Sequence, residues 1–456
     1  MARPSPLSGF PELLPAQRVV ERDVIDSLAR SFELHGFANI ETRVVEPLDR
    51  LAKGGEIDKE IYVLQRLQAQ PDETAGRAPE LGMHYDLTVP FARYVLEHAG
   101  KLEFPFRRFQ IQPAWRGERP QEGRFRQFTQ ADIDVVGQGE LPFHHDVEVM
   151  RVMVEALDAL PLPPLSFQVN NRKLIQGFYR GLGIPDVTAA IRVIDKLDKL
   201  PAEAVAEQLV EAAGATPEQA RTALALAEIR VPDTSFVDRV RALGVHDELL
   251  DVGLAELAAV VEGCAPATGE HVSVEANLRI ARGLDYYTGT VVEIFMRGYE
   301  RLKSVGGGGR YDALASDGRT SYPGVGVSFG VSRTLVPLLA DGVLAGSRPV
   351  PSAVLVAVND EESRPASDAV AAALRARGVP CEVAASASRF GKQIRYAERR
   401  GIPFVWFPGA GEDGDQVKDI RTGEQVDADP AAWRPPDEDL RPSVLTRTID
   451  DEESTP

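Results

Sequence analysis

Apolar positions near the start of the chain follow first a helical and then a strand-like pattern. Over residues 17–36 they recur at the spacing of an amphipathic helix, and Gly36 is a typical helix-ending residue. Residues 37–47 then form a strand-like stretch that ends at Pro47. We therefore predict a helix followed by a strand.

Alternating apolar and polar residues predict further strands at 61–65, 106–115 and 125–137. The last two are separated by a short loop, residues 118–124, that contains a proline and a glycine. This arrangement predicts a long antiparallel hairpin with a basic tip.

From about residue 170 to 268 the chain becomes rich in alanine and other helix-forming residues. Thr216 followed by Pro217 is a typical helix start. Strand-like sequence resumes at 272–296, and residues 324–339 predict a strand that runs into a helix. The alanine-rich part is therefore expected to be a helical insertion within a sheet-forming domain.

A linker rich in Gly, Ser and Pro, residues 345–352, marks the next boundary. Beyond it, apolar runs and helical patterns alternate as β-α-β-α-β, which predicts a small α/β domain with parallel strands. The sequence after Trp433 is rich in proline and acidic residues, so we expect it to be disordered.

Composition sets limits on the class of protein. A chain of 456 residues predicts two or three domains, and 43% hydrophobic with 26% charged residues is typical of a well-cored protein. The apolar runs are shorter than the ~20 residues that span a bilayer, and the N-terminus lacks the pattern of a signal peptide. The only cysteines, Cys264 and Cys381, exclude a disulfide framework, and the histidines lack metal-ligand spacing. We expect a cytoplasmic protein without membrane contact or structural zinc.

Positive charge is concentrated in the predicted hairpin. Six arginines and two glutamates lie within residues 107–126, although the whole chain has a net charge of −18. Arg116 and Arg124 fall on opposite arms, where their planar guanidinium groups suit phosphate oxygens. Phe128 suits stacking on a base, and Glu118 suits orienting an arginine or accepting from an adenine amine. The alternative is that the arginines form only a solvated face of the ribbon.

Three other groups of polar residues predict a small polar substrate: residues 86–88, Gln130 with Asp134, and the run 282–293. Asp86 and Thr88, with Leu87 between them, are expected on one side of a strand, where an acid and a hydroxyl suit an ammonium group. Gln130 and Asp134 are spaced i, i+4 and are expected on one strand face. A turn or strand-end acid remains open for the first pair, and structural pairing with a neighbouring strand for the second.

The run from Arg282 to Glu293, RGLDYYTGTVVE, holds an arginine, an acid and a tyrosine pair at the start of a β-branched strand. The tyrosines are Tyr286 and Tyr287. Such a density of polar aromatic and charged residues suits a pocket between a phosphate and a small substrate. The alternative is an aromatic strand that packs into the core.

These motifs resemble those of the histidyl-tRNA synthetases, a family of class II aminoacyl-tRNA synthetases. WRGE with RFRQF is similar to motif 2, RGLDYY to the histidine-specific signature, GVGVSFGVSR to motif 3, and GGGGRYDAL is typical of the family. The resemblance implies an α/β protein: an α+β catalytic domain with an antiparallel sheet flanked by helices, a helical insertion, and a C-terminal α/β anticodon-binding domain. The implied segments are 1–170 and 269–345 for the catalytic domain, 171–268 for the insertion, 352–433 for the anticodon-binding domain and 434–456 for a disordered acidic tail.

The resemblance also assigns roles to single residues. Arg116 and Arg282 would be the catalytic cations at the α-phosphate. The histidine-binding set would be Asp86, Leu87, Thr88, Arg116, Gln130, Asp134, Arg282, Tyr286 and Tyr287. The ATP-binding set would be Arg116, Glu118, Arg124, Phe128 and Arg333. Arg310 and Tyr311 would lie near the pocket.

Two positions depart from the family pattern. Trp115 replaces the usual Phe, and Ser332 replaces the acid that usually precedes the motif 3 arginine, Arg333. Pro47 would be the motif 1 proline of a dimer interface. The expected partners are ATP as a substrate with Mg²⁺ bridging its phosphates, L-histidine, the tRNA for histidine, and a second copy of the chain.

The expected reaction is ligation of histidine to its tRNA through a histidyl-adenylate. The alternative is a non-catalytic paralogue that serves as a regulatory subunit of ATP phosphoribosyltransferase. Such paralogues usually lack the anticodon-binding domain and have lost arginines of the site, whereas this chain keeps Arg116, Arg124 and Arg282. The retained residues favour the enzyme.

Overall fold

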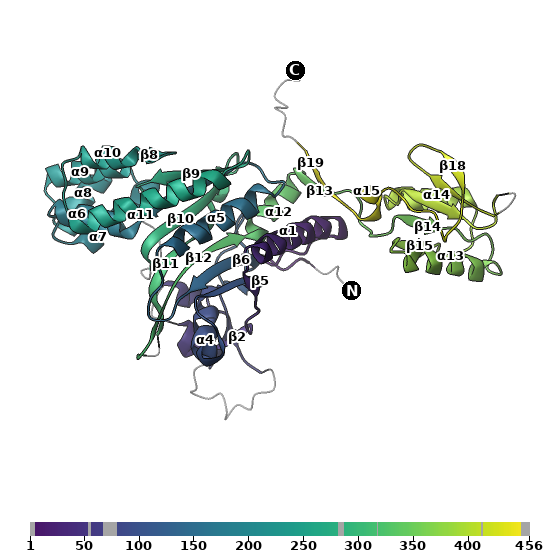
Figure 1. Ribbon diagram of the computed structural model, residues 1–456, viewed down its shortest axis with the longest axis horizontal. Coiled ribbons are helices and arrows are strands. Elements are labelled where there is room, and N and C mark those ends of the chain that lie inside the picture. Colours follow the sequence, from purple (N-terminus) through teal and green to yellow (C-terminus); the bar gives the residue numbers. More distant parts are fainter. Residues whose placement is uncertain are drawn as a thin grey trace, which may run out of the picture. The chain divides into compact units, whose positions relative to one another are not determined.

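The computed structural model describes residues 5–52, 56–66, 80–280, 287–316, 318–411 and 414–447. The chain divides into two compact units (Figure 1). Unit 1 combines residues 1–11 with 25–336, and unit 2 combines residues 12–24 with 337–456. Each unit has its own sheet and is described separately.

Unit 1 is built on a nine-stranded sheet in the order β1-β5-β6-β12-β11-β10-β7-β9-β8. The strands are β1 (Ala38–Asn39), β5 (Phe106–Trp115), β6 (Gln127–Val136), β12 (Ser321–Gly330), β11 (Ser304–Ser316), β10 (Tyr287–Met296), β7 (Leu165–Asn171), β9 (Val272–Asn277) and β8 (Arg230–Val231). Neighbours are antiparallel except for the pairs β1–β5 and β7–β9. The predicted antiparallel sheet is confirmed, with two parallel pairs that the sequence did not indicate.

The predicted hairpin is formed by β5 and β6, which pair without interruption from Phe106↔Val136 to Trp115↔Gln127. Strand β12 continues the antiparallel order on the other side of β6 and leads directly into α12 (Val331–Ala340), as predicted. The basic tip of the hairpin and the start of α12 therefore lie at the same end of three adjacent strands.

One face of this sheet is covered by helices. α5 (His144–Asp158) packs on β6 and β12, and α11 (Glu248–Cys264) packs on β7 and β9 (Figure 1). The predicted N-terminal helix is α1 (Pro15–Leu34), which ends before Gly36, whose φ is +78°. Near its end, Phe32 packs on Phe109 of β5 at a ring distance of 5.6 Å.

A small three-stranded sheet and a helix lie toward the other face. The strands are β2 (Val45–Pro47), β4 (Leu81–Met83) and β3 (Val63–Leu64). Between β2 and β3 lie α2 (Leu48–Leu51) and η1 (Glu56–Glu60), and β4 is followed by α4 (Thr88–His98) and η2 (Ala99–Lys101). The single strand predicted over 37–47 is therefore wrong. It is divided into β1 and β2, because its two ends pair with strands of different sheets.

The strand predicted through Asp86 and Thr88 is also wrong. The chain turns after β4, and Thr88 is the first residue of α4. An oxygen of the Asp86 carboxylate accepts a hydrogen bond from the backbone N–H of Val89 at 3.1 Å. An acid that satisfies a free N–H of a first helical turn stabilises a helix start, so the local capping interaction outweighs the short strand pattern.

The predicted helical insertion consists of α6 (Arg172–Gly181), α7 (Val187–Ile194), η3 (Asp195–Asp198), α8 (Ala202–Ala213), α9 (Pro217–Ala227), α10 (Phe236–Arg241), α11 and η4 (Ala265–Ala267). Thr216 caps α9 in a capping box with Gln219, as the helix-start motif predicted. Helices α6 and α11 approach closely because Gly177 of α6 faces the backbone of α11 and Gly253 of α11 faces the backbone of α6. At either glycine a Cβ would lie 2.2 Å from a main-chain nitrogen of the opposite helix.

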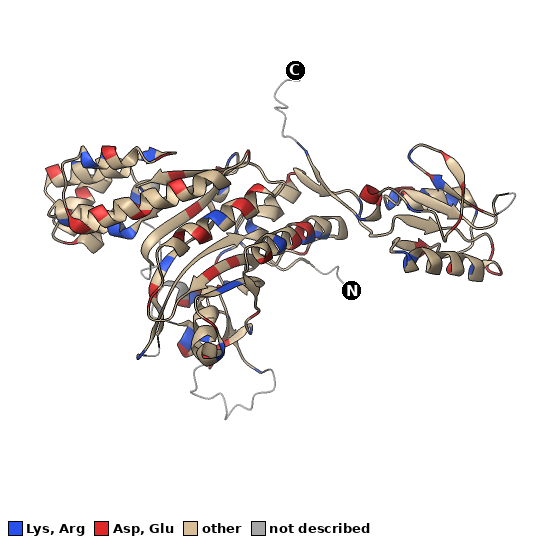
Figure 2. Ribbon diagram, in the orientation of Figure 1, with Lys and Arg blue, Asp and Glu red and all other residues tan. Residues whose placement is uncertain are grey.

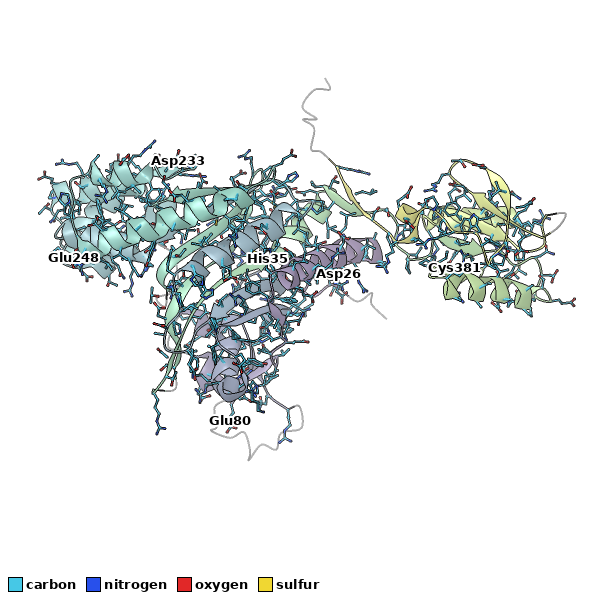
Figure 3. All side chains as sticks on the ribbon, viewed as in Figure 1. Asp26, His35, Glu80, Asp233, Glu248 and Cys381 are labelled. Carbon is cyan, nitrogen blue, oxygen red and sulfur yellow. The ribbon has the colours of Figure 1, made fainter. Side chains whose placement is uncertain are left out.

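Acidic and basic residues both occur along the helices of the insertion (Figure 2). Glu248, labelled in Figure 3, is the first residue of α11, and Asp233 precedes α10. Because acids and bases alternate there, the insertion presents a mixed surface and not a continuous basic one.

Unit 2 contains the predicted α/β domain. Its sheet has the order β15-β14-β16-β17-β18, in which β14 (Val354–Val356) is parallel to both β15 (Cys381–Val383) and β16 (Phe404–Phe407). Helices α13 (Arg364–Ala376) and α14 (Phe390–Arg399) connect these strands, as the β-α-β-α-β pattern predicted. Two antiparallel strands that the pattern did not show, β17 (Asp415–Asp419) and β18 (Gln425–Ala428), extend the sheet.

The predicted disorder from residue 434 onward is wrong for residues 434–447. They form α15 (Asp437–Leu440) and β19 (Val444–Thr446), and β19 pairs with β13 (Leu344–Gly346). Arg421 makes two bonds of 2.8 Å to the Asp439 carboxylate, and Arg348 donates to its backbone oxygen at 2.8 Å. Long-range pairing therefore orders a segment whose composition suggested disorder. Residues 448–456 lie outside the described part of the chain.

Within the described residues, no helix combines the length and the apolar character that crossing a bilayer requires. Both cysteines are buried free thiols, Cys264 in unit 1 and Cys381 in unit 2 (Figure 3).

Candidate active site

Three neighbouring strands place polar side chains on the face of the sheet opposite α5. Cross-strand partners form three rows: Arg108–Asp134–Gly326, Gln110–Asp132–Ser328 and Gln112–Gln130–Gly330. Because side chains alternate along a strand, all of these residues share one face. Gln130 and Asp134 therefore lie on the same face, as their i, i+4 spacing predicted.

Side chains from two other strands, β5 and β11, hold the carboxylate of Asp134. Its Oδ2 lies 2.7 Å from Nη2 of Arg108, and its Oδ1 accepts a hydrogen bond of 2.6 Å from the Tyr311 hydroxyl. Arg108 is fully buried and its guanidinium lies 4.2 Å from the ring centroid of Phe91 in α4. The pairing with neighbouring strands that the sequence left open is thus present, and it fixes the position of the carboxylate.

Burial raises the pKa of Asp134 to about 6. Arg108 and the hydrogen bond from Tyr311 act in the opposite direction, and the nearby charge of Asp86 raises the pKa further. A carboxyl in this position is a strong acceptor when ionised, because little water competes with its partners.

Glycines of β11 and β12 make room for these side chains. A Cβ on Gly326 would lie 2.0 Å from the Asp134 carboxylate, and one on Gly324 would lie 2.4 Å from the Tyr311 ring. On Gly309 it would lie 3.1 Å from the Tyr287 ring. The glycine runs therefore allow an acid and two tyrosines to lie flat across the sheet.

Asp86, Leu87 and Thr88 lie at the start of α4, above this polar face. Leu87 is fully buried, and the charge of Asp86 acts on Asp134 across the space between α4 and β6. The three residues predicted to bind an ammonium group are thus brought to the polar face, where Asp86 acts on both Asp132 and Asp134, although by a helix start and not by a strand.

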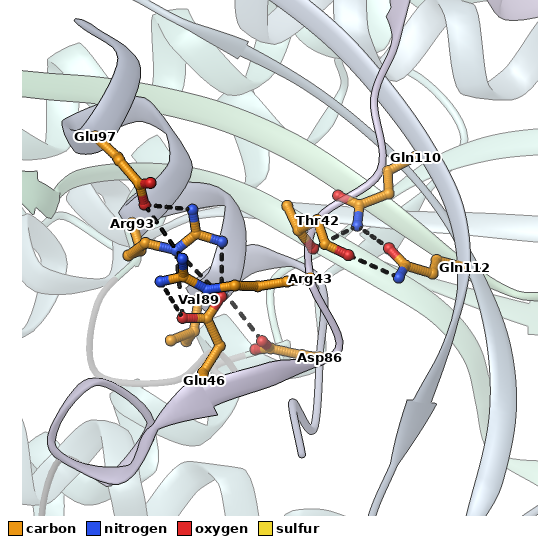
Figure 4. Close-up of polar contacts among 9 residues, drawn as sticks. All are labelled: Thr42, Arg43, Glu46, Asp86, Val89, Arg93, Glu97, Gln110 and Gln112. Carbon is orange, nitrogen blue, oxygen red and sulfur yellow. Dashed lines mark hydrogen bonds and ion pairs between the residues drawn. The ribbon is translucent and has the colours of Figure 1, made fainter. Parts of the chain in front are cut away.

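An ion-pair network centred on the buried Glu46 holds β2 against α4 (Figure 4). Glu46 is 1% exposed and accepts from Arg93 at 2.7 Å and from Arg43 at 3.3 Å. Arg93 also bonds Glu97 at 2.9 Å within α4. Because the network connects the strand to the helix, it positions the helix start that carries Asp86.

The same figure shows how the rest of the polar face is satisfied. Gln110 donates to the Thr42 hydroxyl at 2.9 Å and to Gln112 at 2.5 Å, and Gln112 donates to the Thr42 backbone oxygen at 2.9 Å (Figure 4). These amides connect β5 to the segment before β2, so they act as structural support beside the site.

The arginines of the hairpin lie further along the same strands. Arg116 donates from Nε to the Tyr85 backbone oxygen at 2.9 Å, directly beside Asp86, and its guanidinium lies 5.0 Å from the Phe128 ring centroid. Its Nη1 is 3.9 Å from Glu118. Arg116 therefore lies between the acidic part of the face and the basic tip.

Arg124 and Arg333 complete the basic group. Nη1 of Arg124 is 3.4 Å from Glu118, and Arg333 reaches in from α12 and donates to the Leu302 backbone oxygen. Burial and the positive charges of Arg124 and Arg116 lower the pKa of Arg333 to about 10. Three like charges held together in this way favour binding of an anion, since it would relieve their repulsion.

Ser332, which replaces the expected acid before Arg333, has a structural partner. Its hydroxyl accepts a hydrogen bond of 2.8 Å from the backbone N–H of Thr129 in β6. This bond connects the start of α12 to the hairpin and so supports the position of Arg333. Trp115, the other departure, donates to Gln127 at 3.2 Å across the hairpin.

The histidine-specific run is described only in part. Tyr287 begins β10, lies over Gly309 and acts electrostatically on Tyr311, so it belongs to the polar face. Arg282 and Tyr286 lie outside the described residues. Their predicted roles therefore rest on the sequence.

One expectation about this region is wrong. Arg310 points to the opposite face of the sheet and pairs with Asp146 of α5 at 2.8 Å. The reason is the alternation of a strand: Tyr311 faces the site, so its neighbour cannot.

Comparison with known proteins identifies the family. A histidyl-tRNA synthetase family model matches residues 9–334, and an anticodon-binding domain model matches residues 352–431. The chain belongs to the histidyl-tRNA synthetase family. It is 56% identical to the histidine–tRNA ligase of Cutibacterium acnes over 98% of this chain and 99% of that one. It is 57% identical to that of Micrococcus luteus over 97% and 99%.

Solved structures agree with this membership. The histidyl-tRNA synthetase of Nostoc sp. PCC 7120 superposes with a TM-score of 0.81 at 32% identity, covering 93% of this chain and 96% of that one. An ATP phosphoribosyltransferase regulatory subunit/histidyl-tRNA synthetase from Bacillus halodurans C shares the fold, with a TM-score of 0.70 at 19% identity over 87% and 97%. The full-length, high-identity relatives favour the ligase over the regulatory paralogue.

Two residues of this synthetase fold were absent from the sequence-based site. Arg108 pairs with Asp134, and Asp132 lies between Gln130 and Asp134 on the same face. The signal was present in the sequence, because Arg108 and Asp132 occupy alternate positions of the two hairpin strands. Their importance depended on which strands are neighbours, and the spacing alone does not show this.

Proposed function

We propose that the chain is a histidine–tRNA ligase that forms histidyl-adenylate from L-histidine and ATP, releases diphosphate, and transfers histidine to the 3′ end of its tRNA. Full-length similarity to named histidine–tRNA ligases supports the reaction. The observation that carries it is the arrangement of one sheet face, where a buried acidic group adjoins a group of arginines. An amino acid and a nucleotide need these opposite environments side by side.

Adenylate formation needs positioning and charge neutralisation. A carboxylate oxygen of histidine attacks the α-phosphorus, the bond to the β-phosphate breaks, and diphosphate leaves. The histidine carboxylate is already ionised at neutral pH, so no general base is required. We assign Arg116, which contacts the Tyr85 backbone oxygen and the Phe128 ring, to hold the carboxylate and the α-phosphate together. Arg282 is proposed as the second cation on the basis of its motif.

The remaining arginines suit the nucleotide. We assign Arg124 to the γ-phosphate, and Phe128 with Arg333 to the two sides of the adenine. Glu118 keeps Arg116 and Arg124 oriented at 3.9 and 3.4 Å until phosphate oxygens replace it. These distances are long for ion pairs, so the exchange of partners costs little.

The acidic end of the face suits histidine. Asp86, Thr88 and the backbone of Leu87 would bind the ammonium group with Gln130. Asp134, Tyr286 and Tyr287 would surround the imidazole. A pocket that satisfies the imidazole N–H by hydrogen bonds discriminates against side chains that lack it by ~10⁴-fold or more.

Mg²⁺ is the expected companion of ATP. Its preferred ligands are carboxylate, phosphate and water oxygens, and the carboxylates of Glu118 and Glu293 both act on Arg333 at the basic end of the site. These residues fit the ion and would hold it beside the outer phosphates. When bound, it would neutralise phosphate charge.

We further propose a cytoplasmic homodimer that reads its tRNA partly through the anticodon-binding domain. The match of residues 352–431 to an anticodon-binding model supports the tRNA contact. For the dimer, the support is the motif 1 resemblance at Pro47. This residue ends β2 and lines an open cavity of about 630 Å³ together with Arg43, Arg50 and Arg93.

Histidine-dependent exchange between ATP and labelled pyrophosphate tests the first step. The purified chain should catalyse exchange with L-histidine and not with other amino acids, and it should then charge tRNA for histidine. A chain that binds ATP phosphoribosyltransferase and lacks exchange activity would instead be the regulatory paralogue.

A further inference from the structure

We propose that Asp132 binds the α-ammonium group of the histidine substrate, together with the side-chain oxygen of Gln130. This inference rests on the proposed function and adds to it a residue that the motifs did not assign. Its basis is a pair of buried side-chain oxygens on β6.

Asp132 and Gln130 each carry an acceptor that has no hydrogen-bond partner among the described residues. The atoms are Oδ1 of Asp132 and Oε1 of Gln130, and both are buried. Asp132 is only 2% exposed. A buried acceptor without a partner is costly, so native proteins rarely keep one that no ligand or water satisfies.

The two side chains lie on one strand face and share a hydrogen-bonding partner. Gln130 and Asp132 are two residues apart on β6, so their side chains share a face and their Cα atoms are about 6.6 Å apart. Both side chains also bond the same hydroxyl. Ser328 accepts from Gln130 Nε2 at 2.6 Å and forms a hydrogen bond with the Asp132 carboxylate. One hydroxyl can accept and donate at once, so it draws the two head groups together.

The charges of the acids near Asp132 favour binding of a cation. Asp134 and Asp86 both act on it as like charges, and Arg108 is the opposite charge that acts on it. Arg108 is already at 2.7 Å from Asp134. Asp132 and Asp134 share one buried guanidinium, and an added cation would offset the remaining negative charge.

The chemistry of this cation is restricted by the acceptors. A primary ammonium group offers three N–H donors and a full positive charge, which match the two free oxygens and the neighbouring Asp86. A neutral imidazole offers a single donor and no charge. The ammonium group of the amino acid is therefore the better match for Asp132 and Gln130. The imidazole would then bind near Asp134.

Burial raises the pKa of Asp132 to about 7, partly offset by Arg108. In the ligand-free protein this carboxyl is therefore protonated in a sizeable fraction of molecules at neutral pH. Binding of a cation would favour its ionised form.

The test compares two ligands that differ only at the ammonium position: L-histidine and imidazolelactate, in which a hydroxyl replaces the ammonium. Binding to the full-length protein and to Asp132→Asn is measured by calorimetry at fixed pH. We expect Asp132→Asn to weaken L-histidine binding about 10- to 100-fold, the range of a charged hydrogen bond, and to change imidazolelactate binding by less than about threefold. An equal loss for both ligands, or no loss for L-histidine, would overturn the proposal.

Thermal unfolding separates a binding role from a structural one. Because Asp132→Asn removes an excess buried charge, the ligand-free variant should melt at or above the temperature of the wild type, while the upward shift caused by L-histidine should shrink. A structural residue would behave in the opposite way, with a lower melting temperature and an unchanged shift.

Ser328→Ala provides a second variant that keeps the carboxylate. It should weaken L-histidine binding by a smaller factor, about 3- to 10-fold, and again spare imidazolelactate. Asp312→Asn, at a half-exposed acid of β11 that pairs with Arg310, is the control and should alter neither ligand. If the wild-type protein itself binds no histidine, the proposed function fails. If the wild type binds histidine and Asp132→Asn binds it equally well, only this inference fails.

Discussion

The two ends of the polar face differ in how their charges are held. At the histidine end, Arg108 and Asp134 are almost fully buried and 2.7 Å apart. At the nucleotide end, the side chains of Arg116 and Arg124 are 31% and 38% exposed, and they lie 3.4 to 3.9 Å from Glu118. One end is preformed, whereas the other has partners that are easily exchanged.

The difference suits the ligands that we propose for each end. Specific recognition of a small amino acid requires acceptors fixed by neighbours, because loosely held groups lose discrimination. Binding of a triphosphate requires arginines that are not tightly paired with protein carboxylates, since the phosphate oxygens then become their partners. The comparison predicts that substitutions at the nucleotide end reduce catalysis, and that breaking the buried Arg108–Asp134 pair at the histidine end also reduces stability.

The largest effect is expected at the reacting centre. Arg116→Ala should lower the rate of histidine-dependent pyrophosphate exchange by about 10³-fold, the loss typical of a charge-stabilising group, while the unfolding free energy changes little. Arg282→Ala should likewise abolish adenylate formation in a folded protein. The matched control is Arg119→Ala, an exposed arginine of the same loop, which should exchange at the wild-type rate. Near wild-type exchange in Arg116→Ala would remove this residue from the mechanism.

Adjacent arginines of β5 test the histidine end. Arg108→Met leaves Asp134 buried without its guanidinium partner and should lower the unfolding free energy by about 3–5 kcal/mol. Arg107→Met, one residue away, removes a partly exposed pair with Glu148 on the opposite face and should cost about 1 kcal/mol or less. Urea unfolding monitored by circular dichroism measures both. Equal losses would show that the buried pair has no special importance.

Space beside Asp134 can be tested without changing a charge. A methyl group at Gly326 would lie 2.0 Å from the Asp134 carboxylate, so Gly326→Ala should destabilise the protein by about 1–3 kcal/mol and raise the KM for histidine more than that for ATP. Gly100→Ala is the control, because a Cβ there meets nothing within 4 Å. A variant Gly326→Ala with an unchanged KM for histidine would argue against this position of the carboxylate in the pocket.

A further effect concerns pH and the ligand-free protein. Burial raises the pKa of Asp132 to about 7 and that of Asp134 to about 6, above the ordinary aspartate value of 3.8. A carboxyl whose pKa is higher in the folded state stabilises the fold most below its unfolded pKa, and this stabilisation is lost as pH rises through the folded pKa. Asp132→Asn should therefore gain stability relative to the wild type from about pH 4 to pH 7, by at most about 1.4 kcal/mol per pH unit.

Urea midpoints at several pH values, without histidine, measure this difference. A constant offset between Asp132→Asn and the wild type across that range would show that Asp132 does not titrate in the folded protein.

Several features of the fold were predictable because they depend on local spacing. The β5–β6 hairpin, the capped start of α9 and the shared face of Gln130 and Asp134 all follow from period, turn residues and alternation along the chain. The alternating unit after residue 352 was predictable for the same reason, because parallel β-α-β segments have a clear hydrophobic pattern.

Other features depended on partners far away in the sequence. Asp86 was expected on a strand, yet its carboxylate accepts from the first turn of α4, because a segment as short as residues 86–88 suits a strand end and a helix entrance equally well. The ordering of residues 434–447 depends on Arg421 and on pairing with β13, which composition does not reveal.

The sequence by itself thus determined the family, the elements and most of the residues that gather at the site, since these are contained in motifs and spacing. Only the tertiary structure decided which charges are neutralised and which are left over. The reason is physical: whether a buried acid is a structural partner or a free acceptor depends on the strands beside it. Asp134 has Arg108 and Tyr311 as neighbours, whereas Asp132, two residues away, keeps an oxygen without a partner among the described residues.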